Sequence, residues 1–223
     1  MRRSEINQYI KEALKIFEDH KIHLPLWAHW SAEEWKDNKE QAEEVFATHL
    51  GWDITDFGGG AYEQRGLFLF TLRNCAPPLY EKPYAEKYMI VKENQETPLH
   101  YHYKKQEDII NRGGGVLVLE LFGRDDHDRP LAQDLTVQID GIQTLVAKGE
   151  RVYLKNGQSI TMPRGLYHRF YALQGDGYVL AGEVSSINDD DGDNRFYEDL
   201  GRFPTIEEDA APLRLLVGDY NLL

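Results

Sequence analysis

The 223-residue chain has a single cysteine, Cys75, so it can form neither an internal disulfide nor a cysteine-based zinc site. One unpaired thiol is typical of a reducing compartment, and the N-terminal stretch lacks the apolar core of a signal peptide, so we expect a cytoplasmic protein. No apolar run approaches the about 20 residues that a membrane helix needs. Basic residues are also scarce, because 25 lysines and arginines face 38 acidic residues. The net charge of −13 opposes binding to nucleic acid and to anionic membranes, and we expect neither partner.

Two stretches before residue 50 carry helical signals. In the first, Ser4 is a candidate N-cap, and apolar residues follow at helical spacing: Ile6, Ile10, Ala13, Leu14 and Phe17. In the second, Ser31 and Glu34 match an S-x-x-E capping box, and Trp30 and Trp35 occupy the positions of a hydrophobic staple. We expect this second helix to run to about Thr48.

Short runs rich in valine, leucine, tyrosine and phenylalanine dominate the rest of the chain. They read GLFLFTLRN, KYMIVKEN, GVLVLELFG, LTVQID, RVYLKNG and GYVLAGEVSS, and turn residues separate them. This spacing is typical of an all-β sandwich or barrel rather than of alternating strands and helices. We expect one domain, with an N-terminal helical extension (1–50), a barrel (51–187) and an acidic, irregular tail (188–223) that packs on the barrel.

Two of the eight histidines stand two residues apart, in the stretch TPLHYHYKKQEDIINRGGG. Alternate side chains of a strand share a face, so His100 and His102 point the same way. Glu107 would face the other side of an unbroken strand, so we expect the chain to bend within residues 103–106. The two imidazoles and the carboxylate then converge. Metal binding and a hydrogen-bonded structural pair of histidines are both consistent with this stretch alone.

A second stretch, GQSITMPRGLYHRFYA, makes metal binding the favoured interpretation. It spaces Gly157, Pro163, Gly165 and His168 as G-x5-P-x-G-x2-H, and the earlier stretch reads H-x-H-x4-E-x6-G. Together they resemble the two signature motifs of the cupin superfamily. The resemblance implies a double-stranded β-helix of jelly-roll type. It also implies a divalent metal held by four residues: His100, His102, Glu107 and His168.

The chain departs from the cupin motifs at two positions. The first motif usually opens with glycine, where this chain has Asn94, and asparagine tolerates a left-handed backbone better than most residues. The second motif usually ends with asparagine, where this chain has Ala172, and that residue is not a ligand. Three imidazoles and one carboxylate, without a thiolate, suit Mn²⁺, Fe²⁺, Co²⁺ or Zn²⁺ better than Ca²⁺, and we expect Mn²⁺ first.

The remaining sequence is similar to a narrower group. SEINQYIKEALKIF, HLPLWAHW, GWDITDFG, GLFLFTLRN, EDIINRGGG and GEVSSINDDDGDNRF resemble the D-lyxose isomerase family across almost the whole chain. The resemblance implies a metal-dependent aldose–ketose isomerase and a homodimer. It implies interconversion of D-lyxose and D-xylulose through an enediol chelated by the metal. D-mannose and D-fructose are a second candidate pair, because D-mannose shares the configuration of D-lyxose at C2 and C3. A hydride shift from C2 to C1 is the competing route.

Glu183 is the first candidate for the catalytic base, because it interrupts an apolar strand and a buried carboxylate must be paired or functional. Lys105, between His102 and Glu107, is a candidate for binding a sugar oxygen, and Lys87 is a weaker one of the same kind. Asp190 is a candidate at the rim, although most of the acidic run from 188 to 196 has the composition of a solvated loop.

Two other functions remain consistent with the motifs. An iron-dependent cupin dioxygenase uses the same metal ligands but favours an apolar pocket. The charged residues Glu183, Lys105 and Lys87 argue against such a pocket. A non-catalytic sugar-binding cupin would bind ligand without turnover. Fold alone does not decide among these three.

Overall fold

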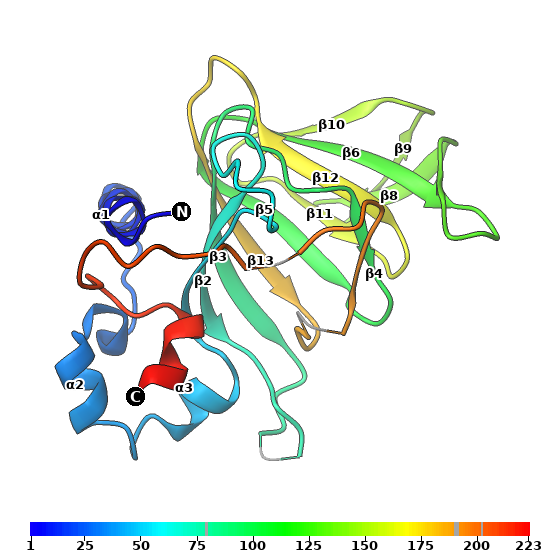
Figure 1. Cartoon of the computed structure of the whole chain (residues 1–223). Coiled ribbons are helices and arrows are strands. Elements are labelled where there is room, and N and C mark those ends of the chain that lie inside the picture. Colours follow the sequence, from blue (N-terminus) through cyan, green and yellow to red (C-terminus); the bar gives the residue numbers. More distant parts are fainter. Residues whose placement is uncertain (79, 190–191, 202) are drawn as a thin grey trace.

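Two antiparallel β-sheets lie face to face in the computed structural model, which describes residues 1–78, 80–189, 192–201 and 203–223. In this part of the chain the first sheet has eight strands, in the spatial order β1 (Gly51–Thr55), β2 (Leu67–Arg73), β3 (Ala85–Val91), β13 (Val179–Ser185), β5 (Glu107–Gly114), β11 (Ser159–Met162), β8 (Leu135–Ile139) and β9 (Ile142–Val146). The second sheet has the order β10 (Arg151–Leu154), β6 (Leu117–Arg124), β12 (Tyr167–Ala172), β4 (His100–His102) and β14 (Asn194–Phe196), with β7 (Pro130–Leu131) beside β6. The expected all-β core of jelly-roll type is confirmed (Figure 1).

The main hydrophobic core fills the space between the two sheets. It is built from alternate positions, because successive side chains of a strand face opposite sides. In β5, for example, Ile109 is buried while Asp108 and Ile110 are only partly buried. Glu107 shares the inward face of β5 with Ile109, so the same alternation carries a carboxylate into the interior.

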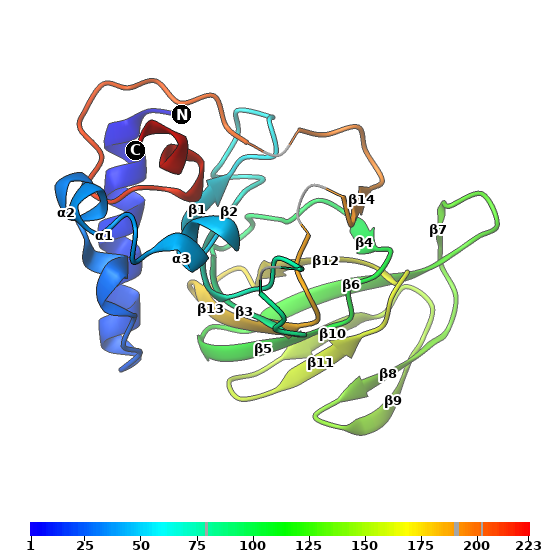
Figure 2. The ribbon, with the colours of Figure 1, turned by 90° about the horizontal axis from the view of Figure 1, so that it is seen from below.

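Helix α1 (Arg3–Asp19) covers the outer face of β1, β2 and β3, on the opposite side from the second sheet (Figure 2). Its apolar stripe, which includes Ile10 and Phe17, packs in a second cluster with Trp52. The predicted N-cap at Ser4 is wrong, because the helix is capped at residue 2. Ser4 lies in the first turn, where its amide and hydroxyl both donate to the carboxylate of Asp209, which therefore does the work of a cap.

The second predicted helix begins as expected but is broken. Ser31 and Glu34 form the capping box, with Ser31 N donating to Glu34 Oε2 at 2.7 Å. The chain then forms α2 (Ala32–Asp37) and, after a turn, α3 (Glu43–Ala47). Asn38 ends α2, where its side-chain Nδ2 donates to Glu34 O at 2.8 Å. An asparagine side chain that bonds to the backbone in this way competes with helix continuation.

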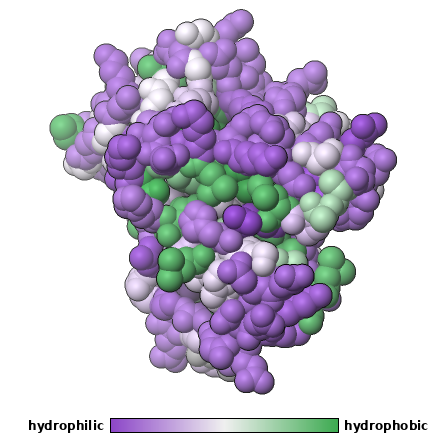
Figure 3. Space-filling view, turned by 90° about the vertical axis from the view of Figure 1, so that its left-hand side faces the viewer, coloured by the Kyte–Doolittle hydropathy of each residue, from purple (hydrophilic) through white to green (hydrophobic). Residues whose placement is uncertain are grey.

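A third apolar cluster joins these short helices to the C-terminal segment. The ring centroids of Trp30 and Trp35 lie 4.9 Å apart, so the two rings are in contact as the staple positions predicted. Leu215 packs in the same cluster. Two 3₁₀ helices, η1 (Leu26–His29) and η2 (Val217–Leu222), lie beside it. On this face of the molecule, hydrophobic residues are visible in a recessed band between hydrophilic regions (Figure 3). No helix in the described ranges is long and apolar enough to cross a membrane.

The six apolar runs predicted strands correctly, but other strands lie outside these runs. Each of the six apolar runs contains a strand, namely β2, β3, β6, β8, β10 and β13. Residues 51–55 lie outside these runs and form β1. Gly113 and Gly114, which also lie outside them, end β5. A Cβ on Gly114 would lie 2.2 Å from Tyr178 O, so the glycine is needed for the close approach of the chain leading into β13.

Candidate active site

Three histidines converge between the sheets. His100 and His102 share the inward face of β4, and His168 of β12 pairs directly with His100 in the strand register. One ligand nitrogen of each histidine lies within 4.8 Å of the others, and no other such cluster of three occurs among the described residues. The alternation that predicted a shared face for His100 and His102 therefore leads to a common site with His168.

Hydrogen bonds to the backbone orient two of these rings. Nδ1 of His100 lies 2.8 Å from Pro98 O, and Nδ1 of His168 lies 3.0 Å from Leu166 O. Each Nδ1 therefore carries the proton and donates, which leaves each Nε2 with a lone pair, as in a metal-ligating histidine. His168 Nε2 and both ring nitrogens of His102 are buried, and within the described part of the chain no group forms a hydrogen bond with them. Buried polar atoms are rarely left unpaired, so these nitrogens fit a missing ligand.

The protonation state of His100 and His102 also suits a metal. Burial lowers the pKa of His100 well below its usual value, and the neighbouring His168 and His102 lower it further. Burial likewise lowers the pKa of His102, and the Lys105 ammonium adds to this effect. Neutral imidazole is the form that binds a metal, so these two residues do not have to release protons before binding one.

Glu107 reaches the same place from the start of β5. Its Oε1 lies 3.1 Å from His168 Nε2, and its Oε2 lies 3.4 Å from His102 Nε2. The expected bend is confirmed, because β4 ends at His102 and β5 begins at Glu107. Glu107 also forms an ion pair with Lys105, whose Nζ lies 2.6 Å from Oε2. Burial alone would raise the pKa of Glu107, but the Lys105 ammonium and the histidines hold it well below its usual range.

Glu183 lies beside this group on β13 and is 4% exposed. Its Oε1 accepts hydrogen bonds from Lys105 Nζ at 3.0 Å and from Ser185 Oγ at 2.9 Å. Burial opposes its charge, but the ammonium groups of Lys105 and Lys87 lower its pKa below the usual value. Glu183 is therefore ionised at neutral pH, although it is buried.

Lys87, the weaker of the two lysine candidates in the sequence, lies next to Glu183. It pairs with Glu183 in the register of β3 and β13, and its Nζ lies 3.8 Å from Glu183 Oε1. It also donates to Asn188 Oδ1 at 2.6 Å. Asn188 is held by Asn74, because the backbone N of Asn188 donates to Asn74 Oδ1 at 3.0 Å and Asn74 Nδ2 donates to Asn188 O at 3.0 Å. No motif or periodicity indicated this pair of asparagines.

The acidic run after β13 is only partly a solvated loop. Asp190 lies outside the described residues, so its predicted role stays a prediction. Asp193 is 2% exposed and accepts from the backbone amides of Lys104 at 2.7 Å and Lys105 at 2.8 Å. It therefore fixes the turn from which Lys105 reaches the two glutamates, and its reading as a solvated residue is wrong.

A cavity of about 90 Å³ opens onto these groups. Its lining includes His100, His102, Glu107, Lys105, Lys87 and Glu183, together with apolar walls. The ring of Phe196 lies 5.5 Å from the His100 ring and 5.7 Å from the Phe57 ring, so aromatic side chains border the site. A larger cavity of about 880 Å³ is lined by Asn188 but by none of the three histidines, and we place the candidate site in the smaller one.

Comparisons with known proteins give matches that extend over nearly the whole chain. A profile of the D-lyxose isomerase family matches residues 1–220. The chain is 45% identical over 224 residues to the D-lyxose/D-mannose isomerase of Escherichia coli O157:H7, covering 99% of both chains. It is 45% identical over 223 residues to the enzyme of the same name from Serratia proteamaculans, covering 99% of this chain and 98% of the relative.

Among solved structures, the fold is similar to that of the L-ribose isomerase of Cellulomonas parahominis. The TM-score is 0.63 at 15% identity, and the match covers 93% of this chain and 98% of the other. Identity this low is informative about the fold alone, which it supports over nearly the full length. In contrast, the family profile matches residues 1–220, and each of the two relatives is 45% identical over 99% of this chain. The chain therefore belongs to the D-lyxose isomerase family.

Proposed function

We propose that the chain interconverts D-lyxose and D-xylulose, and also D-mannose and D-fructose, with a divalent metal held by His100, His102, Glu107 and His168. Family membership makes the chain a sugar isomerase. The substrates are inferred from the names of the two relatives. The observation that carries the proposal is the cluster of three histidines with unpartnered buried nitrogens, beside an ionised Glu183.

The donor set suits a borderline divalent ion. Neutral imidazoles and a carboxylate, with no thiolate near them, favour Mn²⁺, Fe²⁺, Co²⁺ or Zn²⁺, and Mn²⁺ remains our first expectation. A divalent ion bound there would act as a Lewis acid on the carbonyl of the open-chain sugar and make the proton on C2 more acidic. We call these four ligand residues the metal centre.

Glu183 supplies the base. Lys105 and Ser185 hold its Oε1, and within the described residues the side-chain hydrogen bonds of Glu183 all end on that oxygen. Oε2 is therefore the atom available to accept the proton from C2 and return it to C1, through an enediol. A carboxylate fixed by one oxygen keeps the other in a constant position, which is what repeated transfer between two adjacent carbons requires.

The two lysines support the charge that develops on the sugar oxygens. Lys105 is 4% exposed and Lys87 is 5% exposed, and both ammonium groups border the cavity. Buried donors of this kind stabilise an anionic sugar oxygen more than a neutral one, because little water screens them. Lys105 also neutralises Glu107 and Glu183 when no substrate is present.

Two earlier alternatives lose support. Membership in an isomerase family disfavours both the iron-dependent dioxygenase and the non-catalytic sugar-binding cupin. The hydride shift from C2 to C1 competes with the proton transfer that we propose. Incorporation of deuterium from solvent into the product distinguishes them, because only the enediol route exchanges the transferred hydrogen.

The decisive assay measures D-xylulose formed from D-lyxose by purified protein loaded with Mn²⁺ or Co²⁺. We expect turnover that disappears after chelation and returns when metal is added. Absence of turnover with both metals, in protein shown to contain them, would refute the proposed function. The homodimer, the cytoplasmic location and the division at residues 50 and 187 stay predictions.

A further inference from the structure

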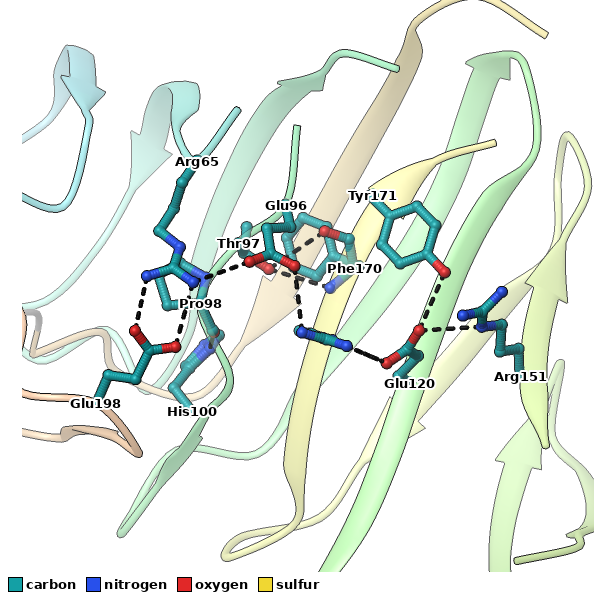
Figure 4. A network of polar contacts seen from close by, with 11 residues as sticks. Arg65, Glu96, Thr97, Pro98, His100, Glu120, Arg151, Phe170, Tyr171 and Glu198 are labelled. Atoms are coloured by element: carbon teal, nitrogen blue, oxygen red, sulfur yellow. Dashed lines mark hydrogen bonds and ion pairs between the residues drawn. The ribbon is translucent and has the colours of Figure 1, made fainter. Parts of the chain in front are cut away.

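An alternating series of acidic and basic side chains runs along the outer side of the second sheet (Figure 4). We call it the outer ion-pair chain, and its members in order are Glu198, Arg65, Glu96, Arg169, Glu120 and Arg151. Arg65 bridges two carboxylates, with Nη1 at 2.8 Å from Glu198 Oε2 and Nη2 at 3.0 Å from Glu96 Oε1. Isolated surface ion pairs contribute little to stability, so a series this long invites another explanation.

The carboxylates at one end belong to segments that build the metal centre. Glu96 lies two residues before Pro98, whose carbonyl accepts the Nδ1 proton of His100. Glu198 follows β14, which pairs with β4 and brings the Phe196 ring to 5.5 Å from the His100 ring. The amide of Tyr197 also donates to Leu99 O at 2.9 Å. Arg65 therefore joins, from outside, the two chain segments that flank His100.

The segment that contains Pro98 is held by individual contacts, because residues 92–99 belong to no strand. At an isolated bridge between residues 65 and 96, Glu96 N donates to Gln64 O at 3.0 Å and Gly66 N donates to Glu96 O at 3.3 Å. Thr97 exchanges hydrogen bonds with the backbone of Phe170, which holds the inner side of the segment. The outer side is held by Glu96 through its ion pairs with Arg65 and Arg169, whose Nη1 lies 3.2 Å from Glu96 Oε2.

We propose that Arg65 is a positioning residue for the metal centre, and this inference rests on the proposed function. By clamping Glu96 to Glu198 it fixes the Pro98 carbonyl and β14, and through them the orientation of His100. Metal affinity depends on ligands that are already oriented before the ion arrives, since any freedom lost on binding weakens it. Loss of Arg65 should therefore weaken metal binding without touching any ligand.

The loss of charge and the loss of positioning predict opposite changes in metal affinity for Arg65→Met. Removing a cation from the neighbourhood of a divalent ion reduces repulsion, so electrostatics alone predicts tighter metal binding in Arg65→Met. Loss of positioning predicts weaker binding. Substitution of residues that contact a ligand directly typically lowers metal affinity by about 10–100-fold, and Arg65 acts through further residues, so we expect about a fivefold loss.

Arg151→Met is the matched control. Arg151 stands at the far end of the outer ion-pair chain, and its one carboxylate partner among the described residues is Glu120, at 3.0 Å. The affinity of Mn²⁺ or Co²⁺ is measured by competition with a chromophoric chelator, at a temperature where all variants are folded. Amide exchange of Tyr197 in metal-free protein is the second measurement. We expect Arg65→Met to weaken metal binding and speed this exchange, Arg65→Lys to restore part of both, and Arg151→Met to change neither.

Unchanged or tighter metal binding by Arg65→Met would overturn the inference, and so would an equal loss in Arg151→Met. If Arg65→Met does not fold, Glu198→Gln takes its place, and normal Tyr197 exchange with normal affinity in that variant would equally overturn it. Failure of the wild-type protein to bind metal would instead refute the proposed function. The two failures are therefore distinguishable.

Discussion

At the scale of the residue, the proposed function makes one carboxylate oxygen of Glu183 the catalytic base. Replacing the carboxylate by an amide of the same shape removes the base, so we expect Glu183→Gln to lower kcat by about 10²–10⁴-fold. Metal content should stay unchanged, because Glu183 is not one of the four proposed metal ligands. Steady-state kinetics with D-lyxose and metal analysis of the same sample test this.

Glu86→Gln is the control for that change. Glu86 lies on the neighbouring strand β3, one residue before Lys87, and pairs with Arg73 on the exposed side. The same loss of a carboxylate there should leave kcat within about twofold, since surface substitutions rarely propagate. Normal turnover by a metal-loaded Glu183→Gln protein would assign the base to another residue.

Lys105 neutralises two buried carboxylates, so its loss should make stability depend on pH in a new way. In the wild type, the ammonium keeps the pKa of Glu107 and of Glu183 below their usual values. Without it, in Lys105→Met, burial and mutual repulsion raise the pKa of at least one glutamate above its unfolded value near about 4.3. A raised pKa stabilises the fold below the unfolded pKa, and that stability is lost as the pH rises through the folded one.

We therefore expect Lys105→Met, free of metal, to be less stable than the wild type by about 3–5 kcal/mol at pH 7 and by clearly less at pH 5. Urea unfolding at the two pH values measures the difference. Lys104→Met is the control, because Lys104 precedes it in the same turn but its side chain is exposed. A deficit of equal size at both pH values would contradict the proposed role of Lys105 in neutralising these carboxylates.

At the scale of the element, the close approach of β5 and the chain leading into β13 depends on a missing side chain. Gly114 has φ +92°, and a Cβ there would meet Tyr178 O at 2.2 Å. Gly175 has nearly the same backbone, at φ +90°, but a Cβ there would have no neighbour within 4 Å. Alanine at Gly175 should cost roughly 1 kcal/mol for the backbone alone.

Alanine at Gly114 adds a collision with backbone, so we expect a destabilisation of about 3 kcal/mol or more. Because β13 carries Glu183, the strand shift should also lower kcat. Thermal unfolding of the two alanine variants isolates the collision, since the conformational term is common to both. Equal melting temperatures would mean that the strands accommodate the methyl group without strain.

Elements that alternate or carry bulky side chains were predictable, and elements held by tertiary contacts were not. The shared face of His100 and His102 followed from strand periodicity alone. The break after Asn38 depends on a side-chain bond to Glu34 O, which competes with a helix that the sequence otherwise favours. Asp193 stands in an irregular acidic run without periodicity, so nothing in the sequence separated the buried carboxylate from its solvated neighbours.

At the scale of the whole molecule, the two ends of the chain are joined by a buried arginine. Arg3, at the start of α1, is 1% exposed and binds Asp219 of η2 with both terminal nitrogens, at 2.8 and 2.9 Å. Its remaining donors reach Glu208. No local pattern predicted these contacts, because Asp219 and Glu208 each lie more than 200 residues from Arg3 in the sequence.

Arg3→Met should therefore destabilise the protein by about 3–5 kcal/mol, because it leaves the carboxylate of Asp219 buried without its cation. Arg2→Met removes the same charge one residue earlier, where the side chain is 62% exposed and 3.7 Å from Glu207, and should change stability by less than about 0.5 kcal/mol. Chemical denaturation measures both. The double variant Arg3→Met, Asp219→Asn should recover part of the loss, because it removes the unpaired buried charge while the amide oxygen can still accept from Leu216 N. No recovery would mean that Arg3 acts through Glu208 instead.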